Sequence, residues 1–315
     1  MILAAGVASA WGFNFLVIDW GMPGIPPLLF VAVRFAVVAA FVVIVPHPVA
    51  SWATIVGVGL FMSLGQFGLL YTSLALGLQP GLAALLLQAQ AVFTVVIAAG
   101  VLRERPTLGQ TVGVTIGVVG LAAVALGRGG DAPALAVVLA LAAALSWAVG
   151  NVISRRAGVV TGRGRLGALS LTVWSALVVP VPALALAFVV EGPSAIASGL
   201  GAFGWPAALS TLYTAGLCTL VGYAIFNGLL ARNPSAAVVP WVLLAPVVAM
   251  VAAAALLGQV PAPAEAIGGV LLVVGVLVTS VGARDRRKAR TAHPATGMVA
   301  VPVGGDEPRS AGRED

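Results

Sequence analysis

The chain has 315 residues, of which 60% are hydrophobic and only 8% are charged. A soluble domain carries roughly 25% charged residues, so this composition excludes a protein whose whole surface faces water. The formal net charge of +6 does not indicate nucleic acid as a partner, because the basic residues sit in short loops and in the C-terminal tail, as in membrane proteins. The single cysteine, Cys218, allows no internal disulfide.

Ten apolar stretches follow one another along the chain, and a helix needs about 20 such residues to cross the hydrocarbon of a bilayer. Turn residues and charges separate the stretches; Pro26 and Pro27, for example, open the second one. The sequence therefore predicts an all-α integral membrane protein of about ten transmembrane helices. The predicted spans are residues 2–19, 27–45, 53–72, 80–101, 107–126, 133–153, 166–190, 207–230, 234–257 and 264–282.

Arginine residues are distributed unevenly between the two sets of loops. With the N-terminus in the cytoplasm, the outward loops hold only Arg128. This asymmetry predicts a multi-pass protein of the cytoplasmic (inner) membrane with both termini in the cytoplasm. Residues 284–315 are polar, and we predict a disordered basic tail that attracts anionic membrane lipid. The inward loops would hold Arg103, Arg105, Arg155, Arg156, Arg163, Arg165 and Arg232.

The chain also repeats itself weakly, which predicts a first repeat over residues 1–127 and a second over 133–283. Trp11 with Asn14 in the first half is echoed by Trp147 with Asn151 in the second. Because each half would contain five helices, an odd number, the second half enters the membrane in the opposite orientation. Inverted repeats of this kind are a transporter architecture. A second matching pair is Arg103-Glu104-Arg105-Pro106 with Gly258-Gln259-Val260-Pro261.

Arg34 is the basic residue that we place inside a span, about 10 Å deep at 1.5 Å per residue. Its guanidinium either holds the carboxylate of a solute or reaches outward to the lipid headgroups. Amide and aromatic side chains also lie in several spans, where they either bond helix to helix or line a polar central cavity.

The sequence lacks the residues that several kinds of chemistry require. No Walker motif is present, so we expect no ATP-driven transport and no implied ATP-binding subunit. The two histidines, His47 and His293, fall in a loop and in the tail. We therefore expect neither a metal nor a cofactor, and an enzyme that acts on lipid would need clustered His, Asp or Cys in the spans.

Six short stretches of the sequence match the motifs of a known family. They are Trp11-Gly12-Phe13-Asn14, Arg34-Phe35, Leu87-Gln88-Ala89-Gln90-Ala91, Leu145-Ser146-Trp147 through Asn151, Val173-Trp174-Ser175 and Val221-Gly222-Tyr223. With these stretches the chain resembles the EamA family of the drug/metabolite transporter superfamily. The resemblance covers nearly all of residues 1–283. It departs from the family at Gln259, where the second repeat usually carries Glu.

The resemblance implies ten helices in two EamA repeats and export of amino-acid-type metabolites, with O-acetylserine or cysteine favoured. We thus expect a secondary exporter that moves a small polar solute by alternating access. A broader drug or metabolite transporter of the same superfamily is the alternative. The expected substrate-binding residues, six of which the resemblance places near the central cavity, are Trp11, Asn14, Arg34, Gln66, Gln88, Gln90, Trp147, Asn151, Trp174 and Tyr223.

Overall fold

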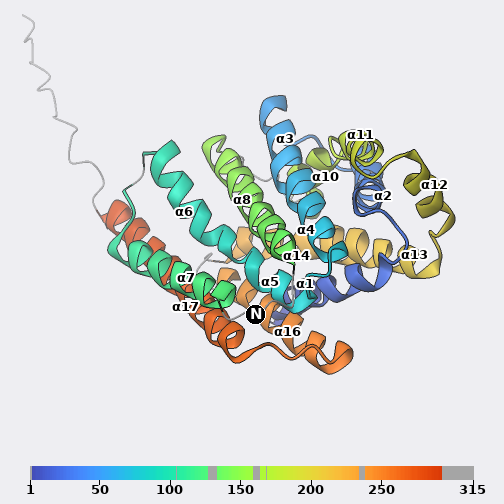
Figure 1. Ribbon diagram of the computed structural model, residues 1–315. Coiled ribbons are helices and arrows are strands. Elements are labelled where there is room, and N and C mark those ends of the chain that lie inside the picture. Colours follow the sequence, from blue (N-terminus) through green and yellow to red (C-terminus); the bar gives the residue numbers. More distant parts are fainter. Residues whose placement is uncertain are drawn as a thin grey trace, which may run out of the picture.

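The computed structural model describes residues 2–103, 105–126, 133–158, 164–167, 169–233 and 238–292, and these contain helices and no strand (Figure 1). Some positions discussed above lie outside the described residues. They are Glu104, Arg128, Arg163, residues 234–237 at the start of the ninth predicted span, and residues 293–315.

The described helices confirm the predicted class of membrane protein. Seven helical segments are long and apolar enough to cross a bilayer, and three shorter apolar segments lie where the remaining spans were expected. Together they account for all ten predicted stretches. The long segments are Ile2–Gly21, Trp52–Ala75, Pro80–Val101, Ala134–Arg156, Ser170–Val190, Trp205–Leu230 and Pro240–Leu257, and the short ones are Pro27–Val43, Leu108–Val124 and Pro263–Thr279.

Most of the spans in the first half of the chain are interrupted. The second ends in a 3-10 turn, the third contains a π-helical segment and the fourth breaks at Gln88. The elements are α1 (Ile2–Gly21), α2 (Pro27–Ala39), η1 (Ala40–Val43), α3 (Trp52–Val58), η2 (Gly59–Gly65), α4 (Gln66–Ala75), α5 (Pro80–Leu87), α6 (Ala89–Val101) and α7 (Leu108–Leu126).

The second half follows the same plan and adds a short helix, α12, between two spans. Pro180 begins a new helix within the seventh span, because a proline ring disrupts the preceding turn. The elements are α8 (Ala134–Arg156), α9 (Gly164–Gly167), α10 (Ser170–Ala176), α11 (Pro180–Val190), α12 (Pro193–Gly201), α13 (Trp205–Thr211), η3 (Leu212–Val221), α14 (Gly222–Arg232), η4 (Val239–Leu243), α16 (Leu244–Leu257) and α17 (Pro263–Ala292).

The C-terminal boundary differs from the prediction, which placed the start of a disordered tail at Arg284. Helix α17 instead continues to Ala292. Residues 284–292 contain no glycine or proline, and their alanine, arginine and lysine residues favour helix. The helix therefore extends beyond the apolar stretch on which the predicted boundary was based.

The two halves contact each other through equivalent helices. The first helix of each half packs against the third span of the other: α1 against α13 and η3, and α8 against η2 and α4. The last helices, α7 and α17, lie side by side along their length (Figure 1). Glycines make this last contact close, because a Cβ on Gly120 would lie 2.6 Å from the carbonyl oxygen of Gly268.

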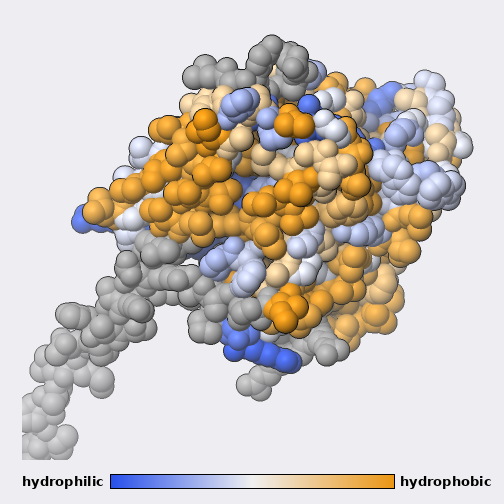
Figure 2. All heavy atoms as spheres, turned by 90° about the horizontal axis from the view of Figure 1, so that it is seen from below, coloured by the Kyte–Doolittle hydropathy of each residue, from blue (hydrophilic) through white to orange (hydrophobic). Residues whose placement is uncertain are grey.

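Apolar side chains cover much of the outer surface, as a lipid environment requires. In Figure 2 hydrophobic residues dominate the face that is seen from below. Val251 of α16 and Val270 of α17, for example, are each 64% exposed. In water such a surface would aggregate, so its natural solvent is the acyl chains of the bilayer.

Candidate solute-binding cavity

A cavity of about 420 Å³ lies among helices of both halves, with polar side chains on its wall. Its size falls within the range of roughly 300–1,000 Å³ that is typical of small-molecule sites. All of the expected binding residues except Trp174 line it. They are Trp11, Asn14, Arg34, Gln66, Gln88, Gln90, Trp147, Asn151 and Tyr223.

Trp174 lies apart from this cavity. Its indole Nε1 donates to the carbonyl oxygen of Val45 at 3.1 Å, and its ring packs against His47 and Trp52 with centroids 4.6 and 5.8 Å away. The side chain thus belongs to an aromatic cluster at one end of the bundle. We therefore leave Trp174 out of the candidate site.

Arg34 points into the protein and not toward the headgroups, since only 2% of its surface is exposed. Its Nη1 donates to the Tyr71 hydroxyl at 3.0 Å, and its Nη2 donates to the Thr219 hydroxyl at 3.2 Å. The guanidinium carbon lies 4.0 Å from the ring centroid of Phe67, which is a cation–π contact. The burial of this side chain excludes the outward-reaching alternative.

The partners of Arg34 in the described part of the chain are neutral. A third contact, from Nη2 to the carbonyl oxygen of Thr214, is long at 3.5 Å, and Nε has no hydrogen-bond partner among the described residues. A buried charge without an opposite charge is expensive. Arg34 therefore places on the cavity wall a positive charge that no opposite charge among the described residues balances.

Amide side chains form a second polar part of the wall. Asn151 Nδ2 donates to Gln90 Oε1 at 3.1 Å and joins α8 to α6. Asn14 is 7% exposed, and its Oδ1 has no partner among the described residues. These groups provide hydrogen-bond acceptors and donors without a net charge.

The break in the fourth span explains why both of its glutamines face the cavity. Helical spacing over a continuous helix directs Gln88 away from the face of Gln90. In the structure the amide N–H of Gln88 bonds to Leu85 and that of Ala91 bonds to Gln88, so the chain makes a tighter turn there. This turn rotates Gln88 onto the cavity wall, where it is 6% exposed.

An aromatic wall completes the cavity. The ring of Trp11 lies against Tyr223 and Phe226, with centroids 5.2 and 5.1 Å away, and its Nε1 donates to the carbonyl oxygen of Cys218 at 2.9 Å. Met62 and Phe67 line the cavity as well. The sequence alone did not indicate Met62, Phe67 or Phe226, because a Phe or Met in an apolar span does not differ from its neighbours in polarity.

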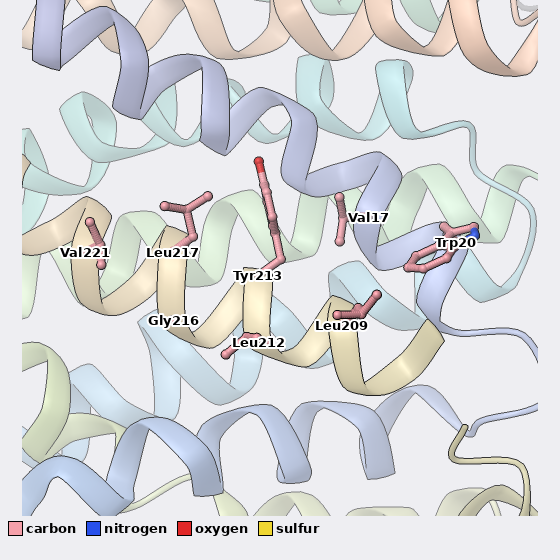
Figure 3. Close-up of a pocket in the computed structure, with 8 residues that line it drawn as sticks. All are labelled: Val17, Trp20, Leu209, Leu212, Tyr213, Gly216, Leu217 and Val221. Carbon is pink, nitrogen blue, oxygen red and sulfur yellow. The ribbon is translucent and has the colours of Figure 1, made fainter. Parts of the chain in front are cut away.

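A second hollow, of about 540 Å³, is unsuited to a polar solute. Figure 3 shows its lining, which comes from α1, α13 and η3 and is almost entirely apolar. Several of these side chains face outward; Leu212, for example, is 64% exposed. This groove belongs to the outer, lipid-covered surface of the bundle.

Comparison with known proteins agrees with the resemblance found in the sequence. Residues 1–126 and 134–281 each match the model of the EamA-like transporter family. A "probable amino-acid metabolite efflux pump" of Salmonella typhimurium is 37% identical over 291 residues, which are 91% of this chain and 97% of the relative. The protein of the same name in Escherichia coli K12 is 33% identical and covers 92% of this chain and 97% of its own length.

Two more distant likenesses extend this comparison. A "probable terminal-alkyne amino-acid exporter" of Streptantibioticus cattleyicolor is 28% identical over 66% of each chain. A solved structure, titled only "Crystal structure of protein", shares the fold with a TM-score of 0.59 at 21% identity, over 90% of this chain and 97% of its own. With the family model matching most of its length, the chain belongs to the EamA-like transporter family.

Proposed function

We propose that this protein is a secondary exporter of small amino-acid-type metabolites across the cytoplasmic membrane, with O-acetylserine or cysteine as favoured solutes. The observation that carries the proposal is the buried Arg34 guanidinium, which faces a cavity and has only neutral partners among the described residues. The names of the two most similar relatives described above support amino-acid metabolites as the class of solute.

A carboxylate suits the Arg34 guanidinium. Its two oxygens match the planar fork of the guanidinium, and such bonds are roughly twice as strong as neutral ones. In this cavity the Nε of Arg34 still lacks an acceptor among the described residues. A bound carboxylate would supply both the missing acceptor and the missing opposite charge.

The rest of the cavity suits the remaining groups of an amino acid. The faces of Trp11 and Tyr223 can attract an ammonium group through cation–π contacts. Asn14 Oδ1, which has no partner among the described residues, can accept a hydrogen bond from it. Gln90 and Asn151 can bond to an ester, a hydroxyl or a thiol on the side chain of the solute.

Alternating access is supported by the arrangement of the two halves, each of which contributes helices to the cavity wall. A cytoplasmic location of both termini is supported by the arginines at helix ends: Arg156 ends α8, Arg232 ends α14 and Arg103 follows α6. Because no nucleotide motif is present, coupling would come from a solute or ion gradient.

A broader drug or metabolite transporter of the same superfamily remains the second candidate. Met62, Phe67 and Phe226 on the cavity wall favour it, because flexible methionine and aromatic surfaces adapt to different solutes. The two candidates differ in whether a carboxylate on the solute is required.

Counterflow into proteoliposomes tests the proposal. Vesicles with the wild-type protein, preloaded with O-acetylserine, should accumulate labelled O-acetylserine faster than protein-free vesicles. Methyl esters of the same solutes, which lack the carboxylate, should compete poorly. Arg34→Ala should lose the activity, while Trp174→Phe, a change outside the cavity, should keep it. If the esters compete as well as the acids, or Arg34→Ala transports normally, the carboxylate site is refuted and the broader carrier is favoured.

A further inference from the structure

The two π-helical segments occupy matching places in the two halves of the chain. Helix α3 begins at Trp52 and has seven residues before η2 begins, and α13 begins at Trp205 and has seven residues before η3 begins. π-helical turns are rare in proteins and are frequently found at functional sites. Its presence in both third spans indicates a shared role.

Each π-helical segment is bonded to the first helix of the opposite half. At η3 the amide N–H of Gly222 bonds to the carbonyls of Leu217 and Thr219, and the carbonyl of Cys218 between them accepts from Trp11 of α1 instead, at 2.9 Å. At η2 the carbonyl of Phe61 accepts from the Ser146 hydroxyl of α8 at 2.8 Å.

A glycine at the end of each segment allows the partner helix to approach. A Cβ on Gly222 would lie 3.0 Å from Nε1 of Trp11, and a Cβ on Gly65 would collide with the Ser146 hydroxyl. The two contacts therefore share three features: a wide helical turn, a glycine at its end and a side-chain donor from the first helix of the other half.

A further bond holds η3 to α1 and comes from Tyr213, which lines the outer apolar groove. The Tyr213 hydroxyl donates to the carbonyl oxygen of Ala10 at 3.0 Å. Figure 3 shows the Tyr213 side chain reaching from η3 toward α1. Neither Tyr213 nor Ser146 lines the solute cavity, so both act on the position of a helix and not on the solute.

The segment η3 is also connected to the candidate site. Arg34 donates to the carbonyl of Thr214 and to the hydroxyl of Thr219, both in η3. A carboxylate that binds Arg34 competes for the same N–H groups. Occupancy of the cavity can therefore loosen η3 from α2. In the other half, η2 approaches α10 at Gly59, where it meets the uncharged backbone of Ser175.

We propose that η2 and η3 are the two flexing joints of the transport cycle, and that Ser146 and Tyr213 are positioning residues that hold them in the conformation described here. The proposal rests on the proposed function, because it assigns moving parts to alternating access. An amide bonds to the carbonyl five residues back in a π-helical turn and four residues back in an α-helical turn, so a segment can change from one to the other and keep its backbone bonds. Such a change rotates the rest of the span relative to the first helix of the other half.

Ser146→Ala and Tyr213→Phe each remove one hydrogen bond at a joint. The matched control is Ser73→Ala, because the Ser73 hydroxyl also joins α4 to α8, donating to Ala136 at 2.6 Å, but does not touch a π-helical segment. In net efflux the carrier must return across the membrane empty after each cycle, whereas in counterflow it returns with a solute bound. We expect each joint variant to change the ratio of net efflux to counterflow about two- to tenfold, the effect of one hydrogen bond, with solute affinity unchanged and with Ser73→Ala like the wild type.

Hydrogen exchange provides a readout that needs no solute. Amides of residues 59–65 should exchange faster in Ser146→Ala, and amides of residues 212–221 should do so in Tyr213→Phe, while Ser73→Ala changes neither segment. If Ser146→Ala does not fold, the results for Tyr213→Phe alone decide whether the joint proposal holds. Failure of counterflow in the wild type would refute the proposed function; joint variants that match Ser73→Ala in both transport and exchange would refute the joints alone.

Discussion

The glycine contact between α7 and α17 allows a prediction about Gly→Ala substitutions. Whether the substitution lowers or raises stability should depend only on where the glycine lies. We compare Gly113→Ala in α7 with Gly228→Ala in α14. Both add one methyl group to a helix. A Cβ on Gly113 would lie 2.5 Å from the carbonyl oxygen of Gly275 and 2.5 Å from the amide nitrogen of Thr279, whereas a Cβ on Gly228 meets nothing within 4 Å.

The magnitude follows from these distances. Ordinary contact begins at 3.4 Å, so at Gly113 the two helix backbones must separate by about 0.9 Å. Gaps of roughly 0.5–1 Å forfeit a quarter to a half of the local dispersion energy, and overpacking costs about 1–3 kcal/mol. The gain in helix propensity returns at most about 1 kcal/mol. We expect Gly113→Ala to lose about 1–2 kcal/mol of stability and Gly228→Ala to gain up to about 1 kcal/mol.

Thermal unfolding of the purified variants in one detergent measures both effects. Gly275→Ala serves as a second test from the other side of the contact, since its Cβ would lie 2.6 Å from the carbonyl oxygen of Gly113. The melting temperature should fall for both contact variants and rise slightly for Gly228→Ala. Equal melting temperatures for Gly113→Ala and Gly228→Ala would show that the two helices are not in backbone contact.

Three further predictions concern the cavity and one helix end. Arg34→Met should weaken solute binding by about 2–5 kcal/mol yet change stability by less than about 2 kcal/mol, because removing a buried charge offsets the lost hydrogen bonds; unchanged affinity in a binding titration would contradict this. Gln90→Ala and Asn151→Ala should couple by about 0.5–1.5 kcal/mol in a double-mutant cycle of stability, and additive effects would mean that their bond is not formed. Burial raises the pKa of Glu191, whose carboxylate accepts from the amide of Leu28 at 2.8 Å. The folded state therefore binds this proton more tightly than the unfolded state, and stability should rise as pH falls through the raised pKa; Glu191→Gln should flatten the dependence of melting temperature on pH, and an unchanged slope would refute the assignment.

Much of the candidate site could be predicted from the sequence, because a polar side chain in an apolar span is costly in lipid and faces the protein interior or a cavity. Arg34, Gln66 and Asn151 stand out for this reason, and all three line the cavity. Trp174 shows the limit of the argument, since a tryptophan in a span satisfies its N–H equally well at a backbone carbonyl. Gln88 reached the cavity through a break in its helix that the periodicity of the sequence does not reveal.

Insertion into a bilayer depends on the composition of each window of about 20 residues, so the ten spans can be predicted from the sequence. The contacts between spans cannot, because the direction in which side chains point beyond an irregular turn depends on what the helix packs against. The π-helical segments η2 and η3 shift that phase in the third and eighth spans, and Gln88 shifts it in the fourth. Only the packing of one half against the other decided which polar groups meet around the cavity, since hydrogen bonds such as those of Trp11 and Ser146 join residues 207 and 85 positions apart.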